Sequence, residues 1–270
     1  MQQSTYDSCL LYSTQPFGVV GLQTDDTLFV GDDEFVEREQ EKLVRAKFLA
    51  KQRERLTPTH ELKFNGGIIR NETTGISLTQ ERQCKNLKPI SRTNTTTTNS
   101  RGTIRHNLSI KEQYIAQRAR GAYVASVCQP EAAYDLSVAA QVTEPTEKDV
   151  HTLNKRIQWQ IENAARGLWF VKLDKDSLQL MVFTDASFAN NKDLSSQVGF
   201  VLVLADAKGR ANIIHWSSTK CKRVTRSVLA SELYGMAHGF DMGASVKSTV
   251  DLILQINLLL VLYTDSKSLY

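Results

Sequence analysis

The sequence has 270 residues, of which 41% are hydrophobic and 23% are charged, and its formal net charge is +4. A chain of this length and apolar content can bury a core, so a disordered tail is excluded and one or two domains are expected. Lys and Arg outnumber Asp and Glu by 33 to 29, which permits a nucleic-acid partner without demanding one. Cys9, Cys84, Cys128 and Cys221 are far apart, so neither a zinc ribbon nor a disulfide framework is indicated.

The sequence carries no recognisable targeting or membrane segment. Its first residues lack the basic and apolar regions of a signal peptide. The most apolar stretch, residues 252–263, is interrupted by Gln255 and Asn257 and falls short of the ~20 residues needed to span a bilayer. We therefore expect an intracellular protein, cytoplasmic or nuclear, with reduced cysteines and no membrane partner.

The first region, residues 1–82, combines predicted strands with one charged helix. Residues 18–31 predict a β-hairpin with Asp25 and Asp26 at its tip, and LKFNGGII predicts two short strands around a glycine turn. Residues 35–55 predict a helix with one packed face. The apolar residues of that face are Val36, Leu43, Val44, Phe48 and Leu49.

A polar tract separates this region from a helical one. Residues 83–110 contain TNTTTTNSRGT, which cannot bury apolar surface and therefore predicts a low-complexity loop. Residues 111–175 predict Ala-rich helices that are broken at Pro130, followed by a helix with Thr146 as its N-cap. The last of these helices carries an apolar face made of Val150, Leu153, Ile157 and Ile161.

From residue 176 onward the pattern predicts a mixed α/β fold. Three consecutive segments predict the strands of an antiparallel meander, namely LQLMVFTDASFA, QVGFVLVLAD and ANIIHWSSTK. RSVLASELYGMAHGFDMGASVK predicts a helix, and we expect a second short helix after it. The apolar first part of LLLVLYTDSKS then predicts a strand that is apolar on both faces. Such a strand favours a central, buried and parallel position in the sheet.

Three carboxylates of this region could meet at one point. Asp185 and Asp265 come near the ends of the first and last strands, and adjacent strands bring such ends together. Glu232 lies about 60° around the intervening helix from Leu229, at the edge of a predicted apolar stripe that should face the sheet. That stripe consists of Leu229, Leu233, Met236 and Phe240.

Convergent carboxylates repel one another and need a cation. Oxygen ligands select Mg²⁺ or Mn²⁺, and two such ions can activate a water for phosphodiester hydrolysis. Spacing alone supports equally well a second interpretation, in which each acid is a surface residue at the end of its element.

The sequence around these acids carries a family resemblance. Three segments, in their order along the chain, strongly resemble the ribonuclease H domain of copia-type retrotransposon polyproteins. They are FTDASFA, SSTKCKRVTRSVLASELYGM and LYTDSKSL. The resemblance covers residues 178–270 and implies a ribonuclease H-like mixed sheet over 176–270. It implies that Asp185, Glu232 and Asp265 hold two Mg²⁺ ions and cleave the RNA strand of an RNA–DNA hybrid. In integrase relatives of this fold, by contrast, the glutamate comes last.

The resemblance also implies parts that this sequence does not contain. In the family, a helix, a last strand, a histidine and a fourth carboxylate follow the position of Asp265. We therefore expect a C-terminally truncated domain with an exposed sheet edge. Such an edge favours self-association or pairing with the remaining polyprotein segments.

The N-terminal region resembles another part of the same polyproteins. The hairpin over residues 18–31 resembles the palm hairpin of copia-type reverse transcriptases, and LKFNGG resembles the segment that follows it. This implies a partial palm over 1–82, with Asp25 and Asp26 as a remnant polymerase site, and a thumb and connection over 111–175. Gln23 replaces an aromatic residue of the family and the upstream palm aspartate has no counterpart, so no polymerase activity is expected.

A basic cluster precedes the Glu232 helix and consists of Lys220, Lys222, Arg223 and Arg226. It is either a solvated loop or a contact with hybrid phosphates, which the family makes near this element; we favour the contact. Our leading hypothesis is a retrotransposon polyprotein fragment with ribonuclease H activity. The alternatives are a catalytically inactive remnant that at most binds nucleic acid, and a reading frame without selected function.

Overall fold

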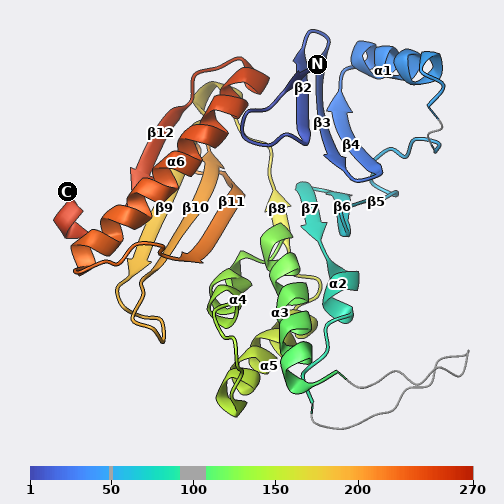
Figure 1. The fold of residues 1–270 in the computed structure, drawn as a ribbon. Coiled ribbons are helices and arrows are strands. Elements are labelled where there is room, and N and C mark those ends of the chain that lie inside the picture. Colours follow the sequence, from blue (N-terminus) through green and yellow to red (C-terminus); the bar gives the residue numbers. More distant parts are fainter. Residues whose placement is uncertain (49–50, 92–107, 270) are drawn as a thin grey trace, which may run out of the picture.

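The computed structural model describes residues 1–48, 51–91 and 108–269, which form a mixed α/β structure (Figure 1). The strands of these residues are arranged in three four-stranded sheets, in agreement with the expected α/β class. Within the same residues, no helix combines the length and the apolar character needed to cross a membrane.

The first sheet is an antiparallel meander near the N-terminus, in the order β1-β2-β3-β4. Its strands are β1 (Gln2–Gln3), β2 (Leu10–Thr14), β3 (Phe17–Gln23) and β4 (Asp26–Gly31). The pairing of β3 with β4 confirms the hairpin predicted over residues 18–31. The sequence pattern did not predict β1 and β2.

Helix α1 (Asp33–Arg45) follows this sheet and is shorter than the helix predicted over residues 35–55. The predicted packed face is wrong, because Val44 and Phe48 are exposed. The helix contacts the β3–β4 hairpin, and among its described residues only Phe35, in its first turn, is buried. Leu49, the last residue of the predicted face, lies outside the described residues.

The second sheet combines segments that are far apart in the sequence, in the order β5-β6-β7-β8. Its strands are β5 (Leu62–Phe64), β6 (Gly67–Glu72), β7 (Gly75–Thr79) and β8 (Leu168–Phe170). The β5–β6 pair confirms the strands predicted from LKFNGGII, whereas β8 lies where helix was predicted. Because β8 pairs with β7, this sheet joins region 1–82 to region 111–175.

Helices dominate residues 111–175, as predicted. They are α3 (Ile110–Val127), α4 (Ala133–Ala139) and α5 (Glu147–Glu162). Thr146 caps α5 as predicted, and Pro130 begins the 3₁₀ turn that separates α3 from α4. Leu153 and Ile157 of the predicted apolar face are buried in the core of this helical layer.

The prediction of a polar loop over residues 83–110 is wrong for its first residues. Its low-complexity part, residues 92–107, lies outside the described residues. Before it, the short helix α2 (Glu81–Lys85) is followed by chain that still contributes to the helical layer. Leu87 and Ile90 are buried there, so the tract cannot be a solvated loop from residue 83 onward.

The third sheet carries the residues predicted to be functional, in the order β11-β10-β9-β12. Its strands are β9 (Gln179–Ser187), β10 (Gln197–Ala205), β11 (Ala211–Lys220) and β12 (Leu259–Tyr263). The first three form the predicted antiparallel meander, and β12 pairs with β9 in parallel as expected. The predicted central and buried position of β12 is wrong: it is an edge strand of the described sheet, and Leu259 and Tyr263 are exposed.

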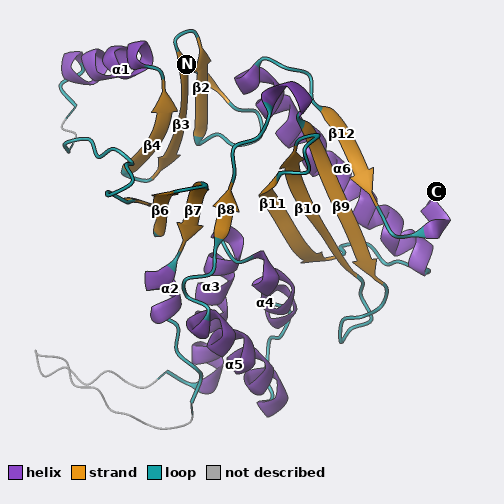
Figure 2. Cartoon of the chain, turned by 180° about the vertical axis from the view of Figure 1, so that it is seen from behind, coloured by secondary structure: helices purple, strands orange, loops and turns teal. Residues whose placement is uncertain are grey.

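One long helix, α6 (Val228–Leu254), covers one face of this sheet (Figure 1), and Figure 2 shows the opposite face. The second short helix that we expected is part of α6. The predicted apolar stripe does not face the sheet, because Leu229, Leu233 and Phe240 are exposed. The packed side of α6 is instead made largely of small residues, namely Ser231, Gly235, Gly239, Gly243 and Thr249.

Glycine is required on this side because the helix lies directly against the strands. A Cβ atom at Gly239 would overlap Cγ2 of Thr184 and lie 3.0 Å from Cγ1 of Val182, and a Cβ at Gly243 would lie 2.7 Å from Cγ2 of Val182. The helix axis therefore approaches β9 more closely than a larger side chain would allow.

We expect Gly239→Ala to destabilise the protein by about 1–3 kcal/mol, the usual cost of overpacking a core. Without the contact with β9, the higher helix propensity of alanine would stabilise the protein by about 1 kcal/mol. The sign of the measured change in stability therefore tests this contact. Urea unfolding followed by circular dichroism measures it. Ala237→Ser, on the exposed side of the same helix, should change stability by less than about 0.5 kcal/mol. A Gly239→Ala protein as stable as wild type would contradict the close packing.

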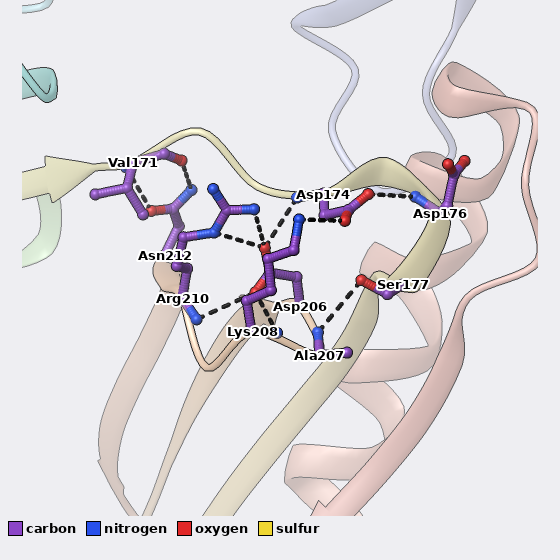
Figure 3. A network of polar contacts seen from close by, with 9 residues as sticks. All are labelled: Val171, Asp174, Asp176, Ser177, Asp206, Ala207, Lys208, Arg210 and Asn212. Carbon is purple, nitrogen blue, oxygen red and sulfur yellow. Dashed lines mark hydrogen bonds and ion pairs between the residues drawn. The ribbon is translucent and has the colours of Figure 1, made fainter.

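A polar network fastens the β10–β11 turn to the segment that leads from β8 into β9 (Figure 3). The buried carboxylate of Asp206 accepts hydrogen bonds from the guanidinium of Arg210 at 2.6 and 2.8 Å and from the backbone N–H of Asp174 at 2.9 Å. The side chain of Asn212 exchanges two hydrogen bonds with the backbone of Val171, at 2.8 and 2.9 Å. These bonds hold the start of β9 in place.

The charge of Asp206 is part of this network. Burial alone would raise the pKa of Asp206, but the Arg210 guanidinium and the backbone amides around it outweigh burial and hold the pKa below its usual range. The ionised carboxylate therefore stabilises the native state. Its contribution is complete above the unfolded pKa of about 3.9 and is lost as the pH falls through the lower folded pKa.

We expect Asp206→Asn to unfold at a lower urea concentration than wild type at pH 7. Because the variant has already lost this charge, acidification to about pH 3 should cost it less stability than it costs wild type. Asp176→Asn, at an exposed aspartate of the same segment, should behave as wild type does. A wild-type urea midpoint for Asp206→Asn at pH 7 would show that the network does not depend on the carboxylate.

Candidate metal centre

Three carboxylates from three elements meet at one end of the third sheet. Asp185 lies on β9, Glu232 on α6 and Asp265 two residues after β12. One oxygen of each lies within 4.8 Å of the others. Asp185 and Asp265 are exposed, whereas Glu232 is only 8% exposed. The structure thus brings together the three acids that the sequence pattern singled out.

The parallel pairing of β9 with β12 places the two aspartates. Phe183 and Tyr263 are paired residues in this register, and Asp185 and Asp265 each follow two residues later. On the other side of Asp185, the paired residue of β10 is Gly199, which has no side chain that could cover the carboxylate. Both aspartates therefore reach the same end of the sheet and stay accessible.

The position of Glu232 follows from the packed side of α6. The helix begins after Ser227, whose side-chain oxygen accepts a hydrogen bond from the backbone N–H of Ala230 at 3.1 Å. Glu232 lies on the same side as Gly235, where a Cβ would be 3.2 Å from the carbonyl oxygen of Asp185. The expectation that Glu232 faces the sheet is confirmed, although small residues and not the predicted stripe bring it there.

The carboxylates disturb one another electrostatically. Burial raises the pKa of Glu232, the charges of Asp185 and Asp265 raise it further, and the backbone amide of Ala186 opposes them. The ionised form of Glu232 is therefore disfavoured in the folded protein. A cation among the three acids would remove this penalty, since it is the opposite charge that favours ionised carboxylates.

The donor set fits a hard divalent cation. It consists of carboxylate oxygens alone, with neither sulfur nor imidazole nitrogen, and this chemistry suits Mg²⁺, Mn²⁺ or Ca²⁺. Two of the three acids are exposed, so an ion has access and can keep water ligands. The cluster could therefore hold a metal ion.

The predicted basic cluster divides into two parts. Lys220 ends β11 and forms an ion pair with Asp193. Lys222, Arg223 and Arg226 are exposed in the segment between β11 and α6. That segment leads directly into the helix that carries Glu232.

The remnant polymerase residues lie elsewhere. Asp25, in the turn after β3, and Asp26, the first residue of β4, are exposed at the tip of the hairpin, as predicted. Among the residues that the structure describes, they belong to no group of three metal-binding side chains.

A cavity that the sequence did not predict has a volume of about 530 Å³ and lies between α4, α5 and the β9–β10 connection. Asp149 and Asp135 line it, but they are paired with Lys192 and Arg156. Segments from residue 114 to residue 220 contribute to the lining, and no local motif could have revealed it.

Comparison with known proteins gives a structural likeness but no likeness in sequence. No family model matches the sequence, and no curated protein matches it. Among solved structures, the chain is similar to a foamy viral protease-reverse transcriptase in complex with an RNA/DNA hybrid, with 15% identity and a TM-score of 0.48. The match covers 92% of this chain and 31% of that chain, so the present chain spans about a third of its length.

We expect Glu232→Gln to be at least as stable as wild type in EDTA. In wild type, the repulsion among the three carboxylates is present when the pH is above the raised pKa of Glu232 in the folded protein. It is relieved as the pH falls toward the ordinary glutamate pKa of about 4.3. The uncharged amide of the variant relieves this repulsion at every pH. With Mn²⁺, wild type should gain about 2.7 kcal/mol at an ion concentration of 100 Kd, whereas Glu232→Gln should gain little.

Thermal unfolding in EDTA and in Mn²⁺ measures both effects. Asp241→Asn, at an exposed position of the same helix, should keep the full gain that wild type shows. An equal gain in Glu232→Gln would mean that the ion binds elsewhere.

Proposed function

We propose that residues 176–270 form a ribonuclease H-like nuclease site of the kind found in copia-type retrotransposon polyproteins. Its reaction is the divalent-metal-dependent hydrolysis of the RNA strand of an RNA–DNA hybrid. The observation that carries this proposal is the convergence of Asp185, Glu232 and Asp265 at the ends of β9 and β12, beside the packed side of α6. The sequence around each acid resembles the same family, in the same order.

In this proposal the three carboxylates hold Mg²⁺ ions, for which Mn²⁺ can substitute. When bound, two such ions would activate a water and would stabilise the leaving oxygen of the phosphodiester. The exposed side chains of Asp185 and Asp265 face the substrate, and the carboxylate of Glu232 binds the ions from the buried side. The parallel pairing of Phe183 with Tyr263 brings the two aspartates, two residues further along each chain segment, to the same end of the sheet.

The exposed cations Lys222, Arg223 and Arg226 contact phosphates of the hybrid. They lie on the chain segment that leads into the helix of Glu232. Contacts of this type position the nucleic acid without reading its sequence, and they make binding depend on salt. We propose no polymerase activity for the turn that carries Asp25 and Asp26.

The test is cleavage of an end-labelled RNA–DNA hybrid in Mg²⁺ and in Mn²⁺. We expect wild type to cleave the RNA strand and Asp185→Asn to cleave it about a hundredfold more slowly or not at all, since the variant loses one charged metal ligand. Asp241→Asn, an equivalent change at an exposed site of α6, should cleave as wild type does. Circular dichroism and urea unfolding establish that each protein is folded.

A folded wild-type chain that leaves the hybrid intact would contradict the proposed hydrolysis. Hybrid affinity that falls steeply with salt and is indifferent to Mg²⁺ would then identify a remnant that binds nucleic acid without cutting it. Cleavage that survives in Asp185→Asn would point to a contaminating nuclease.

A further inference from the structure

A buried glutamine joins the helical layer of α3, α4 and α5 to the third sheet. Gln197 is the first residue of β10 and is 3% exposed. Its amide nitrogen donates to the hydroxyl oxygens of Ser137 on α4, at 2.9 Å, and Ser218 on β11, at 3.0 Å. Its amide oxygen accepts from the side chain of Gln141, just after α4, at 3.2 Å and from that of Asn191, in the β9–β10 connection, at 3.3 Å. These four bonds use the two donors and the two acceptor sites of the amide.

Further polar bonds cross the same boundary. Lys192 of the β9–β10 connection pairs with Asp149 of α5 at 2.6 Å. The side-chain amide of Asn190, also in that connection, donates to the hydroxyl of Tyr134 on α4 at 2.8 Å. Helix α4 also contacts β11, next to which it lies in both views (Figures 1 and 2). The β9–β10 connection is therefore held by helices that lie outside residues 176–270.

This connection follows directly on the strand end that carries Asp185. Gln197 is paired with Ser187 of β9, and the next pair on the same face is Gly199 with Asp185. Alternate residues of a strand are about 7 Å apart, so the amide of Gln197 is bonded one step along the sheet from the carboxylate. On its other side Gln197 is paired with Lys220, the last residue of β11. The bonds of Gln197 thus hold the ends of β9 and β11 together with the start of β10.

The polar character of this contact has a physical consequence. Burying an amide costs free energy unless its donors and acceptors find partners, and apolar side chains would join the two layers without that requirement. What the amide adds is orientation, because a small displacement of the strand end would leave buried polar groups unpaired. The contact therefore fixes where the strand end lies, besides holding the layers together.

We propose that Gln197 is a positioning residue of the candidate metal centre. Through its amide, Ser137 and Gln141 hold the end of β9 where Asp185 meets the other two carboxylates. The inference rests on the proposed function, and it makes the metal affinity of the nuclease region depend on side chains outside residues 176–270. Residues that orient metal ligands tune the affinity of the site without touching the ion.

The test measures Mn²⁺ binding to the full chain, stripped of metal beforehand, through the electron paramagnetic resonance signal of the free ion. We expect Ser137→Ala to bind Mn²⁺ about 2- to 30-fold more weakly than wild type, the range for residues that couple to a site without contacting its ligand. Ser137→Thr keeps the hydroxyl and should bind as wild type does. Gln141→Met removes the other bond between α4 and the amide and should weaken binding in the same direction.

Two controls distinguish positioning from a loss of stability. Ser126→Ala removes a hydroxyl of the same layer that donates to the carbonyl oxygen of Tyr123 within α3, and it should keep the wild-type affinity. Asp206→Asn, which lowers stability at the opposite end of β9, should also keep it, since a destabilised but folded chain retains its carboxylate geometry. Circular dichroism and urea unfolding establish that each variant is folded under the binding conditions.

The outcomes separate this inference from the proposed function. If Mn²⁺ binds to wild type but not to Asp185→Asn, and both Ser137→Ala and Gln141→Met bind it as wild type does, the positioning role is wrong and the proposed metal centre stands. If wild type does not bind Mn²⁺, both are wrong. Binding by Ser137→Thr that is as weak as that of Ser137→Ala would also overturn the inference, because the hydroxyl would not be the cause.

Discussion

The close contact between α6 and β9 is the constraint on which the candidate site depends. Gly239 and Gly243 let the helix backbone approach the side chains of Val182 and Thr184 without intervening atoms. Glu232 lies on the same side of the helix, so the approach that buries the glycines also brings its carboxylate to the end of β9. A wider separation between helix and sheet would leave Asp185 and Asp265 as an exposed pair without a third ligand.

The close approach of the three carboxylates is electrostatically unfavourable. Three like charges within 4.8 Å destabilise the fold without a cation, and burial together with the charges of the two aspartates raises the pKa of Glu232. Packing and polar contacts elsewhere must therefore hold the elements in place. The buried core between α6 and the sheet does so on one side, and the bonds of Asp206 do so at the opposite end of β9. A cation then reverses the sign of the interaction among the carboxylates and adds to stability.

Local patterns predicted much of the architecture, and their failures have physical causes. The hairpin, the meander and the cap at Thr146 were predictable, because strand alternation, turn residues and capping depend on neighbours in sequence. The packed side of α6 was not, because a hydrophobicity rule favours Leu229 and Leu233, and the tight packing depends on the absence of a side chain at Gly239. Strand β8 was missed because its partner β7 lies some 90 residues earlier, beyond any local signal.

The alternation of side chains along β9 divides the strand between stability and chemistry. Leu180, Val182 and Thr184 face α6, where the first two are fully buried in the core. Phe183 and Asp185 belong to the opposite face, where they remain exposed. A shift of one residue in register would bury the carboxylate of Asp185 and expose the core, so the packing that stabilises the domain also sets where Asp185 lies. The same register sets Tyr263 beside Phe183 and brings Asp265, two residues further along, to the same end of the sheet as Asp185.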